Sequence, residues 1–121
     1  MHESLISITL FVGIIFCILG LISKIFPPKK INWIYGYRTS SSMKNIDTWN
    51  VANKYSTKLM LMEGIVLTII GVVTLFISDT GVPGEVMAIG LVLLSTIILI
   101  VATEKHLKKV FDKDGNRKHN V

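Results

Sequence analysis

Charged residues are scarce in this sequence, and three long stretches contain almost none. Of the 121 residues, 17% are charged and 50% are hydrophobic, whereas an average soluble domain has about 25% charged residues. Residues 4–23 and 86–103 carry no charge, and residues 59–78 carry only Glu63. A helix needs about 20 mostly apolar residues to cross the hydrocarbon core of a bilayer. These stretches exclude a soluble or secreted globular domain and predict three membrane spans.

Cysteine and histidine are also rare, and neither forms a pattern. The one cysteine, Cys17, lies in the first apolar stretch, so no internal disulfide can form. The three histidines lack the spacing of metal ligands. The sequence has no nucleophile beside a base, no glycine-rich phosphate loop and no paired carboxylates. We therefore expect a protein that is not an enzyme and that uses no metal or other cofactor.

Basic residues are missing between residues 59 and 104 and gather on either side of that region. The segments 27–58 and 104–121 carry six basic residues each, whereas the segment 79–85 carries two acids and no basic residue. Lysine and arginine are enriched in cytoplasmic segments of membrane proteins. We therefore expect the amino terminus outside the cell, the carboxyl terminus in the cytoplasm, and basic residues that face lipid and not nucleic acid.

These features predict an all-α integral membrane protein, folded as a single membrane domain over residues 1–121. The three spans are expected at about residues 4–26, 59–78 and 85–103. Pro27 and Pro28 end the first span, because proline cannot continue the helical hydrogen bonds. Residues 79–84 are expected to form a tight turn, and the basic tail 112–121 is expected to be disordered.

A cytoplasmic loop and an amphipathic helix are predicted over residues 27–58. Ser40, Ser41 and Ser42 offer a helix N-cap, so the helix is expected to begin near Met43. A helical wheel separates two faces. One face carries Lys44, Asp47, Asn50, Lys54 and Lys58, and the other carries Ile46, Trp49, Ala52, Tyr55 and Leu59. No glycine or proline separates this helix from the second span, so either one continuous helix over 43–78 or a bend is possible.

Four glycines lie at helical spacing within the first two spans. Gly13 and Gly20 are seven residues apart, as are Gly64 and Gly71. Small residues allow helix backbones to approach closely in lipid. We expect the first two spans to pack along these glycines, and a homodimer seam is the alternative use.

Glu63 is the one charged residue inside the apolar stretches of the predicted spans. An intramembrane carboxyl group is a candidate functional site, here for binding a proton. However, Glu63 is five residues beyond Lys58, which is ~7 Å along a helix. At that depth it could also be a structural group near the membrane surface.

Two polar residues between the first two spans are further candidates. Asn53 lies one turn after Trp49, on the face that meets other helices or lipid. Its amide needs hydrogen-bond partners there, and backbone groups of residues 31–39 are within reach. Arg38 lies between Gly36 and Thr39, which suggests a turn that fixes its guanidinium group. Contact with lipid phosphates is the simpler role for Arg38.

The order of residues in this region resembles the SdpI/YfhL family of small bacterial membrane proteins, in its short form. The resemblance rests on Tyr35-Gly36-Tyr37-Arg38-Thr39, Ser42-Met43-Lys44-Asn45, Trp49 and Ala52-Asn53. That family has a Gly-x-Arg-Thr loop followed by a helix with a tryptophan and an asparagine. The matching positions here are Gly36, Arg38, Thr39, Trp49 and Asn53. The resemblance covers about residues 5–105, and its distinctive part is 35–53.

The resemblance implies a protein of the bacterial cell membrane that gives immunity to a secreted peptide toxin by binding or sequestering it. Such a toxin collapses the proton-motive force. The five matching residues could form the working site, or they could serve only the fold. A cytosolic regulator could dock on the face formed by Lys44, Asp47 and Lys54.

Two other kinds of function remain open at this point. A small transport or proton-coupled subunit would use Glu63, and it would need a homo-oligomer to build a pathway. A regulatory or structural subunit would belong to a larger membrane complex.

Overall fold

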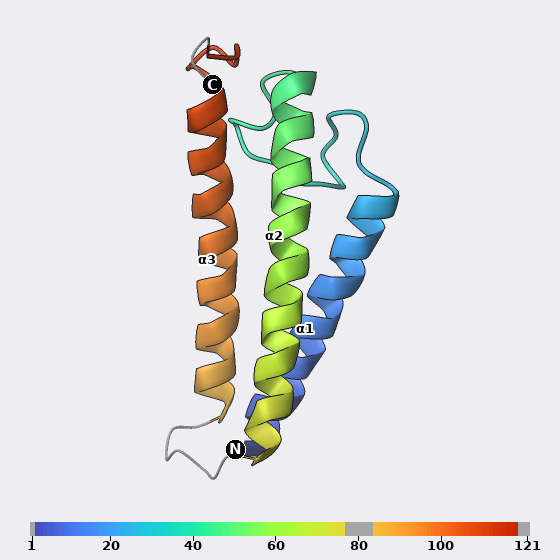
Figure 1. The fold of residues 1–121 in the computed structure, drawn as a ribbon, viewed down its shortest axis with the longest axis vertical. Coiled ribbons are helices and arrows are strands. Elements are labelled where there is room, and N and C mark those ends of the chain that lie inside the picture. The colour runs from blue at the N-terminus through green and yellow to red at the C-terminus, as the bar shows by residue number, and fades with distance from the viewer. Residues whose placement is uncertain (1, 77–83, 119–121) are drawn as a thin grey trace.

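The computed structural model describes residues 2–76 and 84–118 and is helical over most of them. The helices are α1 (His2–Ile25), α2 (Ile46–Val73) and α3 (Gly84–Val110), and a short 3-10 turn, η1 (Thr74–Phe76), extends α2. Figure 1 shows the three long helices side by side, with α2 between α1 and α3. Each of the three is long and apolar enough to cross a membrane. The predicted architecture of three helices long and apolar enough to span a membrane is therefore confirmed over the described residues.

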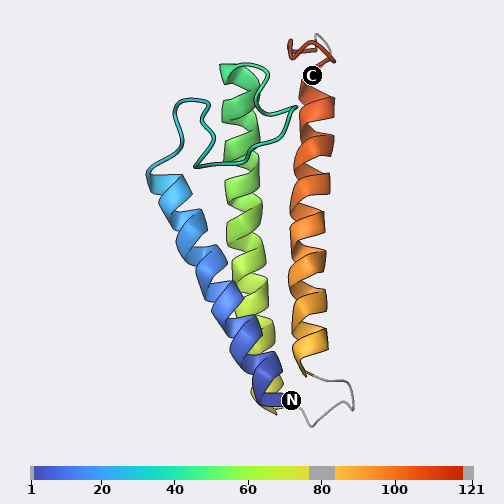
Figure 2. The ribbon, with the colours of Figure 1, turned by 180° about the vertical axis from the view of Figure 1, so that it is seen from behind.

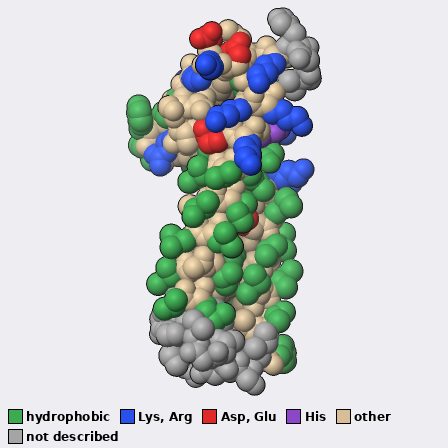
Figure 3. All heavy atoms as spheres, turned by 90° about the vertical axis from the view of Figure 1, so that its left-hand side faces the viewer, with side chains coloured by type: hydrophobic (Ala, Val, Ile, Leu, Met, Phe, Trp, Pro, Cys, Tyr) green, Lys and Arg blue, Asp and Glu red, His purple; other side chains and the backbone are tan. Residues whose placement is uncertain are grey.

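The two basic segments lie at the same end of the bundle. Residues 26–45, which join α1 to α2, lie beside the start of α2 and the end of α3 (Figures 1 and 2). We call this part of the molecule, residues 26–58 and 104–118, the basic end. Figure 3 shows the Lys and Arg side chains gathered there, whereas hydrophobic side chains predominate over the rest of the visible described surface.

The start of α2 differs from the prediction. The helix begins at Ile46, and its N-cap is Asn45 and not one of the serines at 40–42. The Asn45 side-chain oxygen accepts a hydrogen bond from the Thr48 backbone N–H at 2.9 Å. The Thr48 hydroxyl accepts one in return from the Asn45 N–H at 3.1 Å. This reciprocal capping satisfies two N–H groups at the helix start, which a serine three residues earlier would leave unpaired.

No break separates the start of α2 from its membrane-spanning part. The helix is continuous from Ile46 to Val73, which settles the question left open by the sequence. No separate amphipathic helix precedes the second span. Trp49 and Ala52 are nevertheless fully buried, whereas Asn50, Lys54 and Lys58 are exposed.

The glycines do bring α1 and α2 together, as predicted. A Cβ atom on Gly13 would lie 2.7 Å from the Thr68 backbone nitrogen, and one on Gly64 would lie 2.8 Å from that of Cys17. The other two glycines, Gly20 and Gly71, face the side chains of Leu61 and Leu10 at 2.7 Å and their backbone nitrogens at 3.3 and 3.2 Å. A larger side chain at Gly13 or Gly64 would push the helices apart, so the close approach there depends on glycine.

The buried hydrophobic cluster of the molecule lies at the basic end. Ala52, Leu107, Val110 and Phe111 form a cluster at the basic end, with Trp49 also fully buried there. Along the spans, large apolar side chains point outward, as Ile65 and Leu93 do with exposed fractions of 54% and 58%. This outward apolar surface is what a bilayer would cover.

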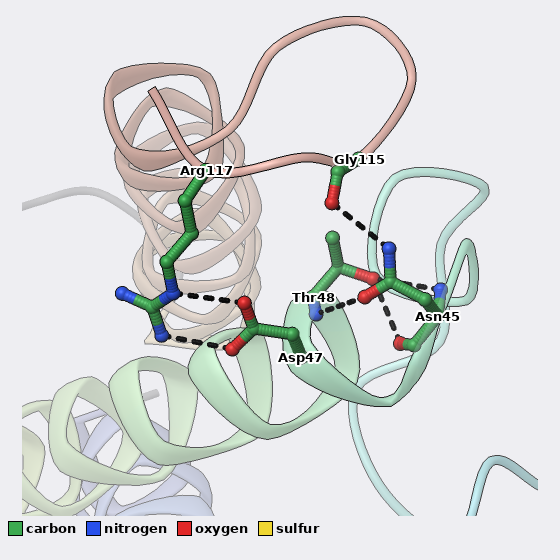
Figure 4. Close-up of polar contacts among 5 residues, drawn as sticks. All are labelled: Asn45, Asp47, Thr48, Gly115 and Arg117. Carbon is green, nitrogen blue, oxygen red and sulfur yellow. Dashed lines mark hydrogen bonds and ion pairs between the residues drawn. The ribbon is translucent and has the colours of Figure 1, made fainter. Parts of the chain in front are cut away.

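The chain after α3 folds back onto α2, which differs from the disordered tail that the sequence predicts. Arg117 forms two hydrogen bonds of 2.8 Å with the Asp47 carboxylate (Figure 4). The Asn45 amide donates to the Gly115 carbonyl oxygen at 2.9 Å. A short backbone bridge between Phe111 and Arg117 closes the turn. Residues 119–121 and most of the expected turn at 79–84 lie outside the described residues.

Candidate functional site

Trp49 holds the start of the loop against α2. Its side chain is fully buried, and its indole N–H donates a hydrogen bond of 2.6 Å to the Pro28 carbonyl oxygen. A buried indole N–H needs such a partner. Pro28 lies three residues beyond the end of α1, and its carbonyl oxygen serves as the acceptor. The bond therefore fixes the point at which the chain leaves the first helix.

Asn53 holds the second half of the same loop. Its side-chain oxygen accepts a hydrogen bond of 2.6 Å from the Tyr37 backbone N–H. Its amide group donates to the Trp49 carbonyl oxygen at 2.9 Å. Asn53 is only 6% exposed, so these bonds satisfy a side chain that is costly to bury alone. The prediction that Asn53 reaches the backbone of the loop is confirmed.

Gly36 lies directly over these two side chains. Its φ angle is +109°, a conformation that side chains with a Cβ rarely adopt. A Cβ atom there would lie 2.6 Å from the Asn53 side-chain oxygen and 3.1 Å from the Trp49 ring. Both the backbone conformation and the available space therefore require glycine at this position.

Glu104 connects the loop to α3, and the sequence reasoning missed it. One carboxylate oxygen accepts hydrogen bonds from the Tyr37 hydroxyl at 2.7 Å and the Thr39 hydroxyl at 3.0 Å. Burial, and then the bond to Glu104, raise the pKa of the Tyr37 phenol above its usual range, so the phenol stays a neutral donor. The available signal was a single carboxylate directly after the third apolar stretch.

Ser42 closes the turn that follows the motif. Its hydroxyl accepts a hydrogen bond from the Thr39 N–H at 2.9 Å and donates to the Tyr37 carbonyl oxygen at 3.0 Å. We call the set Gly36, Tyr37, Thr39, Trp49, Asn53 and Glu104 the loop clasp. The loop clasp ties residues 28–42 to both α2 and α3.

Arg38 differs from its neighbours because its side chain is exposed. Its guanidinium donates a hydrogen bond to the Trp33 carbonyl oxygen, within the same loop. The structure thus shows a loop contact for the guanidinium, as the flanking Gly36 and Thr39 suggested. This one bond leaves other N–H groups of the fork available for a ligand.

A cavity of about 380 Å³ lies beneath the loop, where the three helices meet it. Four of the five motif residues line it, namely Gly36, Arg38, Thr39 and Asn53. All three helices contribute to the rest of the wall, with apolar side chains such as Leu19, Met60 and Leu99 and with the hydroxyl groups of Ser23, Ser56 and Thr57. Trp49, the fifth motif residue, supports the wall from behind through Gly36. The lining therefore mixes polar and apolar groups, which suits an amphipathic ligand.

Glu63 lies apart from the loop clasp, further along α2. Both of its carboxyl oxygens are buried, and neither has a hydrogen-bond partner among the described residues. The burial of these oxygens agrees with either interpretation offered by the sequence, a proton-binding group or a structural group near the membrane surface. Within the described residues no group of His, Cys, Asp or Glu side chains could hold a metal ion.

These features define a small multi-pass helical membrane protein whose first loop is clasped onto its second and third helices. Comparison with known proteins identifies its family. The model of the SdpI/YfhL protein family matches residues 29–103. The chain belongs to this family, and the match contains the whole loop clasp except Glu104.

One curated relative is the uncharacterized protein YfhL of Bacillus subtilis (strain 168). It is 37% identical to this chain over 103 residues, which cover 85% of this chain and 88% of the relative. No solved structure matches the chain.

Proposed function

We propose that this protein is a membrane immunity protein that protects its cell from a secreted peptide toxin. It acts by binding or sequestering the toxin and performs no catalysis. The observation that carries the proposal is membership of the SdpI/YfhL family over residues 29–103. The named relative is uncharacterized, so the immunity role comes from the likeness of the motif to SdpI-type proteins.

The cavity beneath the loop is the binding site in this proposal. It is supported by the position of the motif, since Gly36, Arg38, Thr39 and Asn53 all line that cavity. A membrane-active peptide has apolar side chains that Leu19, Met60 and Leu99 would contact. Its polar groups would then meet the Arg38 guanidinium at the rim. The hydroxyl groups of Tyr37 and Thr39 stay bound to Glu104 and keep the wall in place.

The proposal places the basic end in the cytoplasm and the amino terminus outside the cell. The support is the charge distribution, because both basic segments lie at one end of the bundle (Figure 3). The cavity then opens at the level of the inner leaflet. A toxin that has entered the bilayer would reach it from the side of the membrane.

The test is survival of a toxin-sensitive bacterium that expresses the protein and is challenged with an SDP-type peptide. We expect wild-type protein to preserve survival and membrane potential. Arg38→Ala, matched for its level in the membrane, is expected to lose most of this protection. Lys105→Ala is the control, since Lys105 is exposed on α3 and does not line the cavity. Equal protection by Arg38→Ala would exclude Arg38 from the mechanism.

A second candidate function, proton-coupled transport by an oligomer, is favoured by Glu63. Its two buried and unpartnered carboxyl oxygens are what a proton-binding group in a membrane would present. Reconstituted protein would then produce a pH-dependent flux in liposomes that Glu63→Gln abolishes. No flux from folded wild-type protein would contradict this candidate. If the protein instead co-purified with a larger complex in mild detergent, a regulatory or structural subunit would be favoured.

A cytosolic regulator is another possible partner. Residues 113–117 contact two residues of its expected docking face, which is formed by Lys44, Asp47 and Lys54. The Lys44 ammonium donates a hydrogen bond of 2.6 Å to the Lys113 carbonyl oxygen. Asp47 is paired with Arg117. A regulator that used this face would have to displace residues 113–117, so we propose the face as secondary to the cavity.

A further inference from the structure

A second hollow lies where α1 and α2 diverge. Figure 2 shows α1 leaning away from α2 toward the basic end. The resulting groove has a volume of about 560 Å³ and is lined by α1, the start of the loop and α2, but by no residue of α3. It shares Ser23, Asn53 and Thr57 with the cavity of the loop clasp. The groove therefore adjoins the cavity of the loop clasp, and its remaining lining residues are its own.

Three lysines line this groove. Lys24 comes from the last turn of α1, and Lys54 and Lys58 come from successive turns of α2. The ion pair recorded among the described residues is Asp47 with Arg117. None of the three lysines has a hydrogen bond or a carboxylate partner within residues 2–76 and 84–118. Three unpaired cations from two helices thus line one concave surface, and Lys54 and Lys58 also border a neighbouring hollow toward α3. This concentration of positive charge favours an anionic ligand.

Neutral donors and apolar groups complete the lining. The Ser23 and Thr57 hydroxyls and the Asn50 amide can donate hydrogen bonds to an anion, while Leu61 closes the groove on the side of the spans. Beyond Leu61 the outer surface becomes apolar. Leu21, three residues before Lys24, is 50% exposed, and Ile65, seven residues after Lys58, is 54% exposed. These helical spacings place each apolar side chain on the same face as its lysine.

We propose that this groove is a binding site for an anionic phospholipid. The lipid phosphate lies among Lys24, Lys54 and Lys58, and the acyl chains run along the apolar faces that carry Leu21 and Ile65. A free phosphate ion would use the cations but would leave those apolar faces without a partner. The position of the groove, where the charged end meets the apolar spans, therefore favours the lipid. This inference does not depend on the immunity function.

The test uses purified full-length protein in detergent micelles and a fluorescent phosphatidylglycerol. We expect saturable binding that is at least about tenfold tighter than binding of the matching phosphatidylcholine, since each lysine near an anionic lipid contributes measurably. The variant Lys54→Gln/Lys58→Gln is expected to weaken phosphatidylglycerol binding by about tenfold or more. Lys24→Gln, on the opposite wall, is expected to weaken it by about fivefold.

A matched control removes the same charge with the same spacing elsewhere. Lys105→Gln/Lys109→Gln changes two exposed lysines four residues apart on α3, and it should leave binding within about twofold of wild type. Equal weakening by both double variants would show a general effect of charge and would overturn the proposal. An unchanged affinity in Lys24→Gln would do so as well. Millimolar inorganic phosphate should not displace the lipid, and full displacement would identify a site for free phosphate instead.

Discussion

Gly36 is the position at which a single methyl group should disturb the loop clasp most. In Gly36→Ala the new Cβ would lie 2.6 Å from the Asn53 side-chain oxygen and 2.9 Å from the Pro28 ring. The φ angle of +109° would remain unfavourable even if those neighbours moved. The loop would have to move away from α2. This movement would break the hydrogen bond from the Tyr37 backbone N–H to the Asn53 side-chain oxygen.

The size of the effect follows from these terms. A residue with a Cβ in such a conformation costs about 1–3 kcal/mol, and overpacking of a well-packed region costs about 1–3 kcal/mol. The two costs overlap, because one loop movement relieves both. We therefore expect the free energy of unfolding to fall by about 3 kcal/mol. For a chain of this length that corresponds to a melting temperature lower by about 10 °C or more.

The assay is thermal unfolding of the purified protein in detergent, with Gly90→Ala as the control. A Cβ on Gly90 meets no atom within 4 Å, and alanine is the better helix former by about 1 kcal/mol. Gly90→Ala should therefore melt at or above the wild-type temperature. If Gly36→Ala melted within about 2 °C of wild type, the geometric argument for the loop clasp would be refuted.

Three further predictions concern single side chains. Gly64→Ala places a Cβ 2.8 Å from the Cys17 backbone nitrogen and should cost about 1–3 kcal/mol in thermal unfolding; an unchanged melting temperature would contradict the packing of α1 on α2. Asn53→Ala leaves the Tyr37 N–H without its acceptor and should cost about 1–3 kcal/mol, whereas Asn50→Ala, at an exposed position, should cost little. Because the pKa of Tyr37 is raised in the folded protein, the unfolded chain loses this proton first, and stability should fall as the pH rises above about 10. That alkaline loss should be smaller in Tyr37→Phe, and equal losses in both proteins would show that Tyr37 stays accessible to water.

The sequence was most informative at positions where a physical requirement, such as close helix packing or a partner for a buried amide, allows few residue types or few arrangements. Gly13 and Gly64 could be placed at a helix contact, because only small residues permit such close approach in lipid. Asn53 could be assigned a backbone partner, because a buried amide must be satisfied. Both predictions concern single residues with few alternatives, and the structure confirms both.

The sequence was less informative where two elements distant in the chain compete for the same groups. The serines at 40–42 are good N-cap residues, but Asn45 caps α2 because Thr48 supplies the reciprocal bond. Residues 112–118 have no apolar periodicity, yet they fold back because Arg117 finds Asp47. Glu104 looked like the boundary of an apolar stretch, and only the approach of the loop to α3 makes it an acceptor for Tyr37 and Thr39. Such partners are set by tertiary structure, which local patterns do not contain.

The central claim is that the toxin binds this protein beneath the loop. It is tested most directly by titrating a labelled SDP-type peptide against the wild-type protein in lipid nanodiscs, with empty nanodiscs of the same lipid as the reference. The account predicts saturable binding at one peptide per protein. Arg38→Ala should weaken this binding by about tenfold or more, through loss of a charge-assisted contact worth about 1.5–3 kcal/mol. Binding no stronger than to empty nanodiscs, by protein shown to be folded, would contradict it.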